Sequence, residues 1–449
     1  LVGYGVSVDS SNHTKGDVNG AGYVGGLIGQ VSSSVTNSYS EGNVTGTIYV
    51  GGLIGNGALI TASSAKGDIN GQNYVGGLAG QTTSSVNNSS SEGDVTGQGN
   101  YVGGLVGYGV SVDSSNHTKG DVSGVYYVGG LAGYTSSAVT GSYSEGNVTG
   151  TGDCVGGAVG SASGKIRNSY AVAKYVRGRN IVGGLAGYVD SIDVSYFESD
   201  SVRGINKIGG LVGYANKTVD SSYSTVHVKG DDEVGGLVGS AYGDVSNSYA
   251  IGNVVGDVEH SSAGNDNLGG LVGYQYSGSV SKSMALGNVS GTTKLGGLVG
   301  RFDGTTISQS YANGNVTGSY YGDPADEVGN YYIGGLVGYA KGALEETYAS
   351  GIVKGIEDEP VYTGCIVGYV NGSLNITKSY YDKTKCSLGV DGGEETATVT
   401  GSPDKTTTEM QTQSTFINWD FVDTWKIYEN TYPFLKIFTN SLTNAVVTT

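Results

Sequence analysis

The sequence is dominated by a short glycine-rich motif that returns at a nearly constant spacing. One copy is Gly-Gly-Leu-Val-Gly-Tyr at residues 209–214. Neighbouring copies lie about 26 residues apart until Gly235, a period typical of chains that wind through identical structural repeats. The doublet begins at Gly25, Gly51, Gly76, Gly103, Gly129, Gly156, Gly183, Gly209, Gly235, Gly269, Gly296 and Gly334, and a worn copy follows at residues 364–369. Such regularity predicts one repeat body rather than several globular domains.

Short strand-like segments fill each repeat. In the unit that begins at Gly129, residues 128–134, 138–144 and 147–149 alternate apolar and polar side chains, with Gly, Asn, Asp and Ser between them. Three short strands cannot bury an apolar face alone, so successive coils must stack. We therefore predict an all-β, parallel β-solenoid (β-helix) of about fourteen coils of about 26 residues, with three short strands per coil. The glycines are expected to turn corners at positive φ or to admit a neighbouring coil closely.

Stacked coils place equivalent residues in columns, and the sequence predicts three columns. The first is mostly aromatic, so we interpret its histidines as column members rather than catalytic groups: His13, Tyr39, Ser64, Ser90, His117, Tyr143, Tyr170, Phe197, Tyr223, Tyr249, Met284, Tyr311 and Tyr348. The second alternates in charge: Lys15, Glu41, Lys66, Glu92, Lys119 and Glu145. The third is expected to be solvated or to share a cation: Asp17, Asn43, Asp68, Asp94, Asp121, Asn147, Asn253, Asn288 and Asn315.

The period breaks after Gly235, which suggests a division of the chain. The regular coils are predicted at 1–256 and coils with inserted loops at 257–380, together forming the solenoid 1–380. The repeat then stops, and 381–449 holds both tryptophans and four of the six phenylalanines. We predict a C-terminal cap there that protects the last sheet edge, with a short helix over 406–410.

Two features of the chain bear on length and ends. Residues 1–18 recur unchanged at 105–122, which indicates recent duplication and favours length or valency over a single active site. The chain begins inside a copy of the motif, at Leu1. This start predicts an open sheet edge, and either a cleaved precursor or an absent upstream part.

Composition excludes several classes of protein. The 82 glycines follow no Gly-X-Y period, so collagen is excluded. A net charge of -17 argues against a nucleic-acid partner, because phosphate recognition needs clustered Lys and Arg. The sequence has no run of about 18 apolar residues, so no membrane span is predicted. Of three cysteines, Cys365 and Cys386 are a candidate disulfide pair, and Cys154 has no obvious partner.

The inserted loops hold the candidate binding residues. All three insertions, 257–267, 319–332 and 356–363, precede a Gly-Gly strand, so they are expected to cluster on one face of the solenoid. Solvated loops are the plainer interpretation, and a cation or carbohydrate site is the alternative. The candidates are Asp257, Glu259, Asp266, Tyr320, Tyr321, Asp323, Asp326, Glu327, Tyr331, Tyr332, Glu357, Asp358 and Glu359. No cofactor is predicted beyond Ca²⁺ at these acidic loops.

Asn-x-Ser/Thr triplets are frequent, although a chain rich in Ser, Thr and Asn produces most of them by composition. The glycosylation candidates are Asn12, Asn43, Asn87, Asn88, Asn116, Asn147, Asn216, Asn288, Asn315, Asn371 and Asn375.

The repeat resembles a known family. The Gly-Gly-Leu-x-Gly core followed by Ser-Tyr-Ala-x-Gly-Asn-Val-x-Gly, as at 296–318, is similar to the GLUG repeat of bacterial and archaeal surface proteins. The tail resembles the ending of such arrays in 407–416, in Trp-Asp-Phe at 419–421 and in Tyr-Pro-Phe-Leu at 432–435. The resemblance implies secretion and surface exposure, and supplies no catalytic residues. Gly364-Cys365 and the lost Leu at Ala158 depart from the pattern without breaking the stack.

Three functions remain in view. The first is a non-enzymatic extracellular structural protein that forms a surface layer, stalk or filament by self-association or with other envelope proteins. The second is an adhesin that binds glycan or protein through the inserted loops. The third is a polysaccharide-cleaving β-helix enzyme with paired carboxylates in those loops. The sequence has no His-Glu-x-x-His metal motif and no nucleophile elbow with partners.

Overall fold

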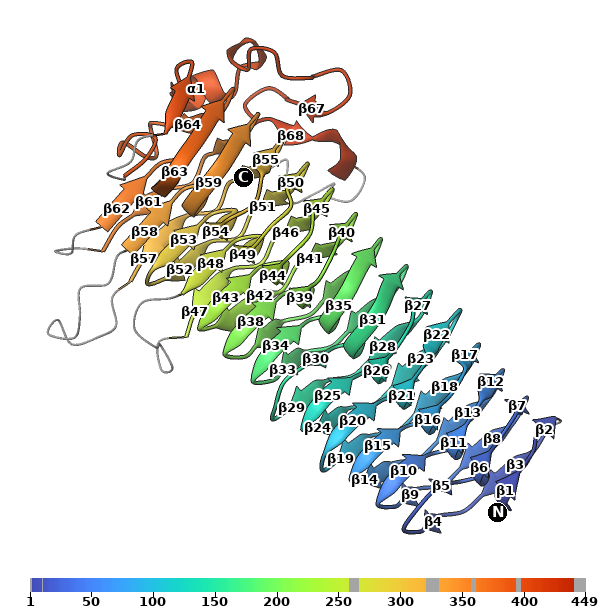
Figure 1. Ribbon diagram of the computed structural model, residues 1–449. Coiled ribbons are helices and arrows are strands. Elements are labelled where there is room, and N and C mark those ends of the chain that lie inside the picture. The colour runs from blue at the N-terminus through green and yellow to red at the C-terminus, as the bar shows by residue number, and fades with distance from the viewer. Residues whose placement is uncertain are drawn as a thin grey trace, which may run out of the picture. The chain divides into compact units, whose positions relative to one another are not determined.

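The chain folds as the predicted parallel β-solenoid, with about fourteen coils of about 26 residues (Figure 1). The computed structural model describes residues 2–9, 11–257, 266–319, 331–356, 361–392 and 397–439. Two compact units divide the chain: unit 1 is Leu1–Lys217 with Ser222–His227, and unit 2 is Thr218–Ser221 with Val228–Thr449. Each unit is a stack of coils whose strands pair in parallel with the strands of the next coil.

A coil of unit 1 has five strands in four sheets, not three. The coil that begins near Gly129 contains β25 (Tyr126–Gly129), β26 (Ala132–Thr135), β27 (Val139–Thr140), β28 (Tyr143–Glu145) and β29 (Val148–Gly150). β26 and β27 share one sheet, and the other three strands lie in one sheet each. The predicted segment 128–134 is broken by a corner after Gly129, and 138–144 is broken at Gly141, whose φ is +52°. The sequence predicts too few strands because corners interrupt segments in which apolar and polar residues alternate.

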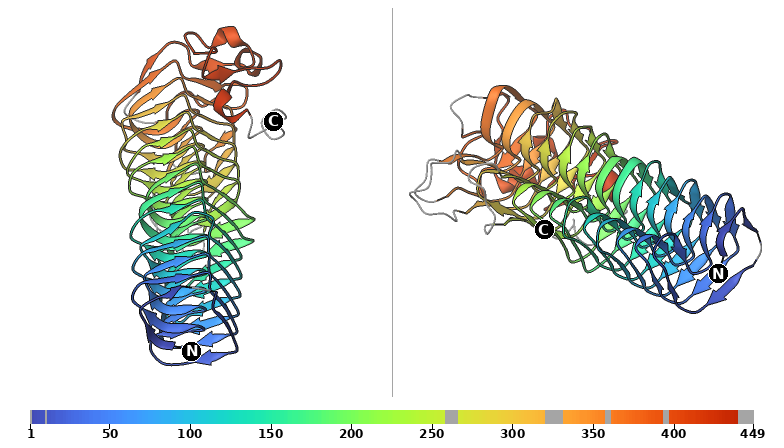
Figure 2. Two further views of the ribbon diagram at one scale, coloured as in Figure 1. Left: turned by 90° about the vertical axis from the view of Figure 1, so that its right-hand side faces the viewer. Right: turned by 60° about the horizontal axis from the view of Figure 1, so that its bottom comes forward.

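The preceding coil shows how register builds the core. Its strands are β20 (Asn100–Gly103), β21 (Val106–Gly109), β22 (Ser111–Asp113), β23 (His117–Lys119) and β24 (Val122–Gly124). Val102 pairs with Val128 and Val122 with Val148, so like side chains stack inside the coil. These valines are no more than 2% exposed. Figure 2 shows the strands of successive coils of unit 1 aligned in this way.

The Gly-Gly doublet is required by close approach of backbones. A Cβ on Gly130 would lie 2.1 Å from the carbonyl oxygen of Gly157 in the next coil, and one on Gly129 would lie 2.2 Å from the Ala132 oxygen. Positive φ belongs instead to the glycine of Ser-Glu-Gly-Asn, such as Gly146 at +135°. The two roles expected of glycine therefore fall on different positions of the repeat.

A buried serine holds the corner between β27 and β28. Ser142 is 1% exposed, and its Oγ donates to the Thr140 oxygen at 2.9 Å. Its backbone N–H donates to the Oγ of Ser169 in the next coil at 3.3 Å. The same N–H to hydroxyl contact joins Ser38 to Ser63 and Ser248 to Ser283, among others. The repeated Ser before the aromatic position is thus a coil-to-coil link.

The predicted columns are present in unit 1, with one correction. Tyr143, Tyr170, Tyr196 and Tyr223 stack with ring centroids 4.9–5.0 Å apart. The prediction that Phe197 belongs to this column is wrong. Tyr196 pairs with Tyr170 and takes that place, while Phe197 turns into the core, where it is 0% exposed. Alternation along a strand makes a one-residue misalignment move a side chain to the opposite face.

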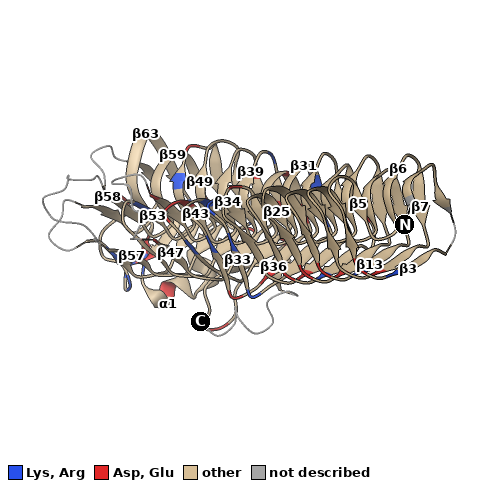
Figure 3. Ribbon diagram, turned by 90° about the horizontal axis from the view of Figure 1, so that it is seen from below, with Lys and Arg blue, Asp and Glu red and all other residues tan. Residues whose placement is uncertain are grey.

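The alternating charges lie opposite one another, as predicted. Lys15 and Glu41 approach to 3.3 Å and Lys66 and Glu92 to 3.4 Å, on exposed side chains. Lys119 pairs in register with Glu92 and Glu145. Figure 3 shows these charges in a line along the strands that include β3 (His13–Lys15) and β13 (Ser64–Lys66).

Unit 2 continues the same plan. Two of its coils comprise β48 (Asn267–Gly269), β49 (Val272–Gln275), β50 (Val280–Ser281), β51 (Met284–Ala285) and β52 (Val289–Gly291), followed by β53 (Lys294–Gly296), β54 (Val299–Phe302), β55 (Thr306–Ser308), β56 (Tyr311–Ala312) and β57 (Val316–Gly318). The last strands are β58 (Tyr331–Gly334), β59 (Val337–Glu345), β60 (Tyr348–Ala349), β61 (Val353–Lys354), β62 (Val361–Gly364), β63 (Val367–Thr377) and β64 (Tyr380–Asp382).

The tail adds to the last coil and contains the predicted helix. β65 (Thr398–Thr400) pairs with β63, and β66 (Asp404–Lys405) pairs with β64. Helix α1 (Thr407–Met410) begins at a capping box in which Thr406 and Glu409 satisfy each other's backbone N–H groups. Then follow η1 (Gln413–Thr415), the antiparallel pair β67 (Trp425–Lys426) and β68 (Phe434–Leu435), and η2 (Lys436–Phe438).

The tail covers the side of unit 2 as well as its last coil. It is therefore more extensive than the predicted cap over the final coil. Trp425 packs 6.0 Å from Tyr311, and Phe438 packs 5.0 Å from Tyr249, which lies further back in the stack. The hydroxyl of Tyr348 donates to the Pro433 oxygen at 2.6 Å. The outward aromatic column of unit 2 is therefore buried beneath the tail.

Replacing Gly130 by Ala is expected to destabilise unit 1 by about 1–3 kcal/mol or more, because the new methyl group would overlap the backbone of the next coil. Thermal unfolding followed by circular dichroism, with hydrogen exchange to locate the loss, measures the effect. Gly22→Ala is the matched control, since a Cβ there meets nothing within 4 Å. Equal melting of the two variants would contradict the close-approach explanation.

Candidate functional site

The three insertions share one corner of unit 2, which we name the insertion corner. They connect β47 (Val254–Gly256) to β48, β57 to β58, and β61 to β62, always between the same two sheets. Of the predicted binding residues, Asp257, Asp266, Tyr331 and Tyr332 lie among the described residues. The others lie outside them: Glu259, Tyr320, Tyr321, Asp323, Asp326, Glu327, Glu357, Asp358 and Glu359.

Asp257 is a buried, paired residue. Its side chain is 3% exposed, and its Oδ1 lies 3.2 Å from the Lys229 Nζ. Its backbone N–H donates to the Gly230 oxygen at 2.6 Å. Asp257 therefore anchors the first insertion to the preceding coil.

Asp266 is a buried carboxyl group that follows the first insertion. It is 4% exposed, and the Thr292 hydroxyl donates to its Oδ2. Burial, followed by the nearby charges of Asp231 and Asp232, raises the pKa of Asp266 to about 7. Lys294 lies close enough to oppose this rise, while burial and Arg301 lower the pKa of Lys294 itself. The corner thus contains a carboxyl group that titrates near neutral pH.

A second buried acid, Glu233, occupies the preceding coil. It accepts a hydrogen bond from the Tyr276 hydroxyl at 2.8 Å and another from Ser240. Burial and this hydrogen bond raise the pKa of Tyr276. Glu233, Asn267 and Lys294 occupy equivalent positions in successive coils, and the next position is Tyr332. One column therefore joins Glu233 to the predicted Tyr332, and Asp266 precedes its member Asn267.

An arginine is stacked between tyrosines at this corner. The Arg301 guanidinium lies 4.7 Å from the Tyr274 ring centroid and 5.1 Å from that of Tyr339. Its Nη2 is 2.8 Å from Asp303, which also lies 3.4 Å from Lys341. Burial alone would raise the pKa of Asp303, but the Tyr274 hydrogen bond and the two cations lower it.

Tyr332 belongs to a surface cluster of tyrosines. Its ring centroid lies 5.7 Å from Tyr339, 5.6 Å from Tyr362 and 4.6 Å from Tyr369. These four rings are half-buried, whereas Tyr331 is 5% exposed. We name Tyr332, Tyr339, Tyr362 and Tyr369 the corner tyrosines. Partly exposed aromatic faces and edges beside a cation suit contact with sugar rings or with apolar peptide side chains.

The sequence interpretation missed Glu233, Lys294, Arg301 and Asp303. A signal was available, because Glu233 and Lys294 stand at a position that is tyrosine in several coils of unit 1, and Arg301 replaces the Tyr of the hexapeptide. Departures from the repeat in consecutive coils were a better guide to this cluster than the acidity of the loops.

The remaining candidates separate by burial. Asn116 is 0% exposed, and its Nδ2 donates to the Val86 and Asp113 oxygens at 2.9 Å each, so it is unsuited to carry a glycan in the folded chain. The other sequons stay predictions, with exposed side chains at Asn43, Asn88, Asn288, Asn315, Asn371 and Asn375.

The candidate disulfide is confirmed. Cys365 and Cys386 form a disulfide, and Cys154 is a free thiol.

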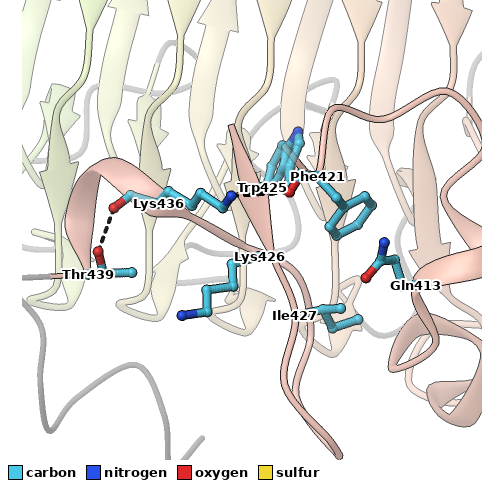
Figure 4. A pocket seen from close by; sticks show the side chains of 7 residues that line it. All are labelled: Gln413, Phe421, Trp425, Lys426, Ile427, Lys436 and Thr439. Carbon is cyan, nitrogen blue, oxygen red and sulfur yellow. Dashed lines mark hydrogen bonds between the residues drawn. The ribbon is translucent and has the colours of Figure 1, made fainter. Parts of the chain in front are cut away.

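A hollow of about 370 Å³ lies within the tail (Figure 4). Its wall is formed by Gln413, Phe421, Trp425, Lys426, Ile427, Lys436 and Thr439. The Lys436 Nζ is held by the Phe421 and Val422 oxygens, so this cation is engaged in the fold of the tail. The insertion corner is therefore the stronger candidate site.

Neither a metal-ligand cluster nor a membrane-spanning helix is present among the described residues. No group of three His, Cys, Asp or Glu there is arranged to hold a metal ion, and Ca²⁺ at the acidic loops stays a prediction. None of the described helices is both long and apolar enough to cross a membrane.

The raised pKa of Asp266 predicts a pH-dependent stability of unit 2. The folded state holds this proton more tightly than the unfolded chain, so the contribution is complete below about pH 4 and is lost as pH rises through about 7. Asp266→Asn is expected to exceed the parent in stability at pH 8 by about 1–3 kcal/mol, with little difference at pH 4.

Denaturant unfolding followed by tryptophan fluorescence measures this, since both tryptophans lie in unit 2. Asp94→Asn, at an exposed ladder position where other coils have Asn, is the control. A parent and an Asp266→Asn variant with parallel pH profiles would contradict the assignment.

Comparison with known proteins agrees with the repeat. The GLUG motif matches residues 20–45, 71–96 and 233–255. A search of curated proteins and a search of solved structures each found no match. The three matched segments each include a Gly-Gly doublet or the strands around it, in both units of the solenoid. The chain therefore contains GLUG motifs within a parallel β-solenoid fold, a combination that fits a structural or adhesin-like repeat protein.

Proposed function

We propose that this protein is a non-enzymatic, extracellular structural protein that forms a cell-surface layer, stalk or filament by self-association. The observation that carries the proposal is what the polar residues of the repeat do. The polar residues that recur most often form hydrogen bonds from one coil to the next. A repeat whose signature residues all serve stacking is suited to building a long scaffold.

The acidic and amide ladder illustrates this use. Asp94 Oδ1 accepts the backbone N–H of Asp121 at 2.8 Å, and Asp121 Oδ1 accepts that of Asn147 at 2.8 Å. Asn288 and Asn315 repeat the contact in unit 2 at 2.8 Å. Each side chain thus supplies an acceptor to the next coil, and a shared cation is unnecessary to explain the ladder.

Self-association predicts particles larger than one chain. Size-exclusion chromatography and electron microscopy of the purified chain, over a range of concentration and salt, are expected to show assemblies that grow with concentration. Salt should weaken any contact that depends on exposed Lys–Glu pairs. Single chains under every condition would remove the layer and filament versions of the proposal.

An adhesin is the second candidate, favoured by the insertion corner. Arg301 stacks on Tyr339, Tyr332 contacts Tyr369, and buried Asp266 belongs to the first of the three insertions that interrupt the regular repeat in the sequence. Aromatic rings and a guanidinium in one patch are common features of binding surfaces for glycans and proteins. Such a patch is a reason to place recognition at this corner rather than on the regular coils.

Deleting residues 320–330 is expected to abolish attachment to glycan- or protein-coated surfaces while the coils stay folded, because β57 ends at Gly318 and β58 begins at Tyr331. Tyr369→Ala should weaken attachment several-fold, since it removes one ring of the patch. Tyr126→Ala, an exposed tyrosine of unit 1, is the matched control. Attachment that survives both the deletion and Tyr369→Ala would count against the adhesin.

A further inference from the structure

Unit 1 carries a second tyrosine column that the repeat analysis did not single out. Tyr23, Tyr49, Tyr74, Tyr101 and Tyr127 stack along the corner before the Gly-Gly doublet, with successive ring centroids 4.8, 4.7, 5.0 and 4.9 Å apart. The interplanar angles are between 8° and 25°. We name these five residues the tyrosine ladder.

Two more tyrosines lie against the ladder. The Tyr108 and Tyr134 rings stack on each other at 4.8 Å. The Tyr108 ring meets Tyr101 edge-on at 5.4 Å and Tyr74 at 6.0 Å. Seven phenols therefore form one continuous cluster at the surface of unit 1, where Tyr23 is 47% exposed and the others are half-buried.

The backbone does not need tyrosine at these positions. Tyr49, Tyr74, Tyr101 and Tyr127 have φ between 54° and 61°, which is an unfavourable conformation for a bulky side chain. The next coils hold Cys154 and Ile181 at the same position with φ of 61° and 54°. The corner is thus built equally well without an aromatic ring, and the run of phenols calls for an explanation beyond the turn.

We propose that the tyrosine ladder is a site of oxidative coupling, at which neighbouring phenols join as dityrosine and link successive coils covalently. Successive rings of the ladder lie 4.7–5.0 Å apart, so two phenoxyl radicals on neighbouring coils are within reach of each other. The two side chains turn from face-to-face to edge-to-edge as the carbons next to the phenol oxygens bond. The oxidant is a peroxide, delivered through a haem peroxidase. It comes from outside the chain.

The reaction balances as follows. Each of two phenols gives one electron to the oxidant and one proton to water, forming two phenoxyl radicals. The radicals couple through a new carbon–carbon bond between the two ortho positions. The hydrogen on each of these carbons then moves to its oxygen and restores the phenol. Hydrogen peroxide accepts the two electrons and two protons and becomes two molecules of water.

The molecule contains an internal comparison. Tyr311 and Tyr348 in unit 2 stack at 4.8 Å and 6°, within the range of distances of the ladder pairs, yet both are 1% exposed. They have the coupling geometry without access to an oxidant. Coupling that requires both stacking and exposure should therefore occur at the ladder, and also in the half-buried stack of Tyr143, Tyr170, Tyr196 and Tyr223, and should spare the Tyr311–Tyr348 pair.

The test treats the full chain with a haem peroxidase and limiting hydrogen peroxide at high dilution. We expect the blue fluorescence of dityrosine, no change in chain mass beyond the loss of two hydrogens per link, and cross-linked peptides that join neighbouring ladder tyrosines. The thermal midpoint of the oxidised chain should rise, because each link ties residues one coil apart in the unfolded state.

Tyr49→Phe, Tyr101→Phe and Tyr108→Phe together should remove most of the cross-linked peptides that join ladder tyrosines, since phenylalanine keeps the ring stack and lacks the phenol. Unchanged melting before oxidation shows that this variant is folded. Tyr126→Phe, an exposed neighbour, should leave the yield unchanged. Links that map chiefly to Tyr4, Tyr126 or Tyr242, undiminished yield of these peptides in the triple variant, or equal coupling of Tyr311 with Tyr348 would each overturn the proposal.

Discussion

The structure depends on backbone hydrogen bonds that run between coils rather than within them. Gly104 N–H donates to the Gly129 oxygen at 3.1 Å, and Leu105 N–H donates to the Leu131 oxygen at 2.8 Å, one coil away. A single coil leaves these groups without partners and its apolar face exposed, so it has no stability alone. The glycine doublet follows from this constraint, because any side chain there would separate the two backbones.

The same constraint dictates which side chains can occupy the surface. Successive coils place equivalent residues one strand spacing apart, about 4.8 Å, so like charges would repel and rings must stack. The Lys66–Glu92 pair and the parallel rings of Tyr143 and Tyr170 are two solutions to that crowding. Exposed ion pairs of this kind add only a few tenths of a kcal/mol each, so they fix register more than stability.

Periodicity was sufficient to predict the solenoid, the coil length and most columns, because each coil repeats the same local chemistry. It could not give the number of strands, since residues at positive φ, such as Asn37 and Tyr49, turn corners without glycine or proline to mark them. The cluster at Glu233 and Lys294 was missed because periodicity predicts what recurs, and these residues depart from the tyrosine that recurs at their position in unit 1. The side-chain contacts of the tail were also out of reach, because Tyr249 and Phe438 are remote in sequence.

The surface on which the tail packs can nevertheless be recognised in the sequence, by a change of residue type along one column. In most coils of unit 1 the residue two places after the aromatic column is charged, as in Lys66 and Glu145, and burying it would require removing the charge from water. In unit 2 the same position is occupied in successive coils by Ile251, Leu286, Asn313 and Ser350. The aromatic column of unit 2 therefore lies beside neutral residues as far as Ser350, and the tail's tryptophans can cover it there without stranding a charge. In the next coil the position is Asp382, whose carboxylate accepts hydrogen bonds from the Thr407 and Tyr432 hydroxyls of the tail. The change from charged to neutral residues along one column marks where the tail binds, and the charged column of unit 1 marks a surface that stays in contact with water.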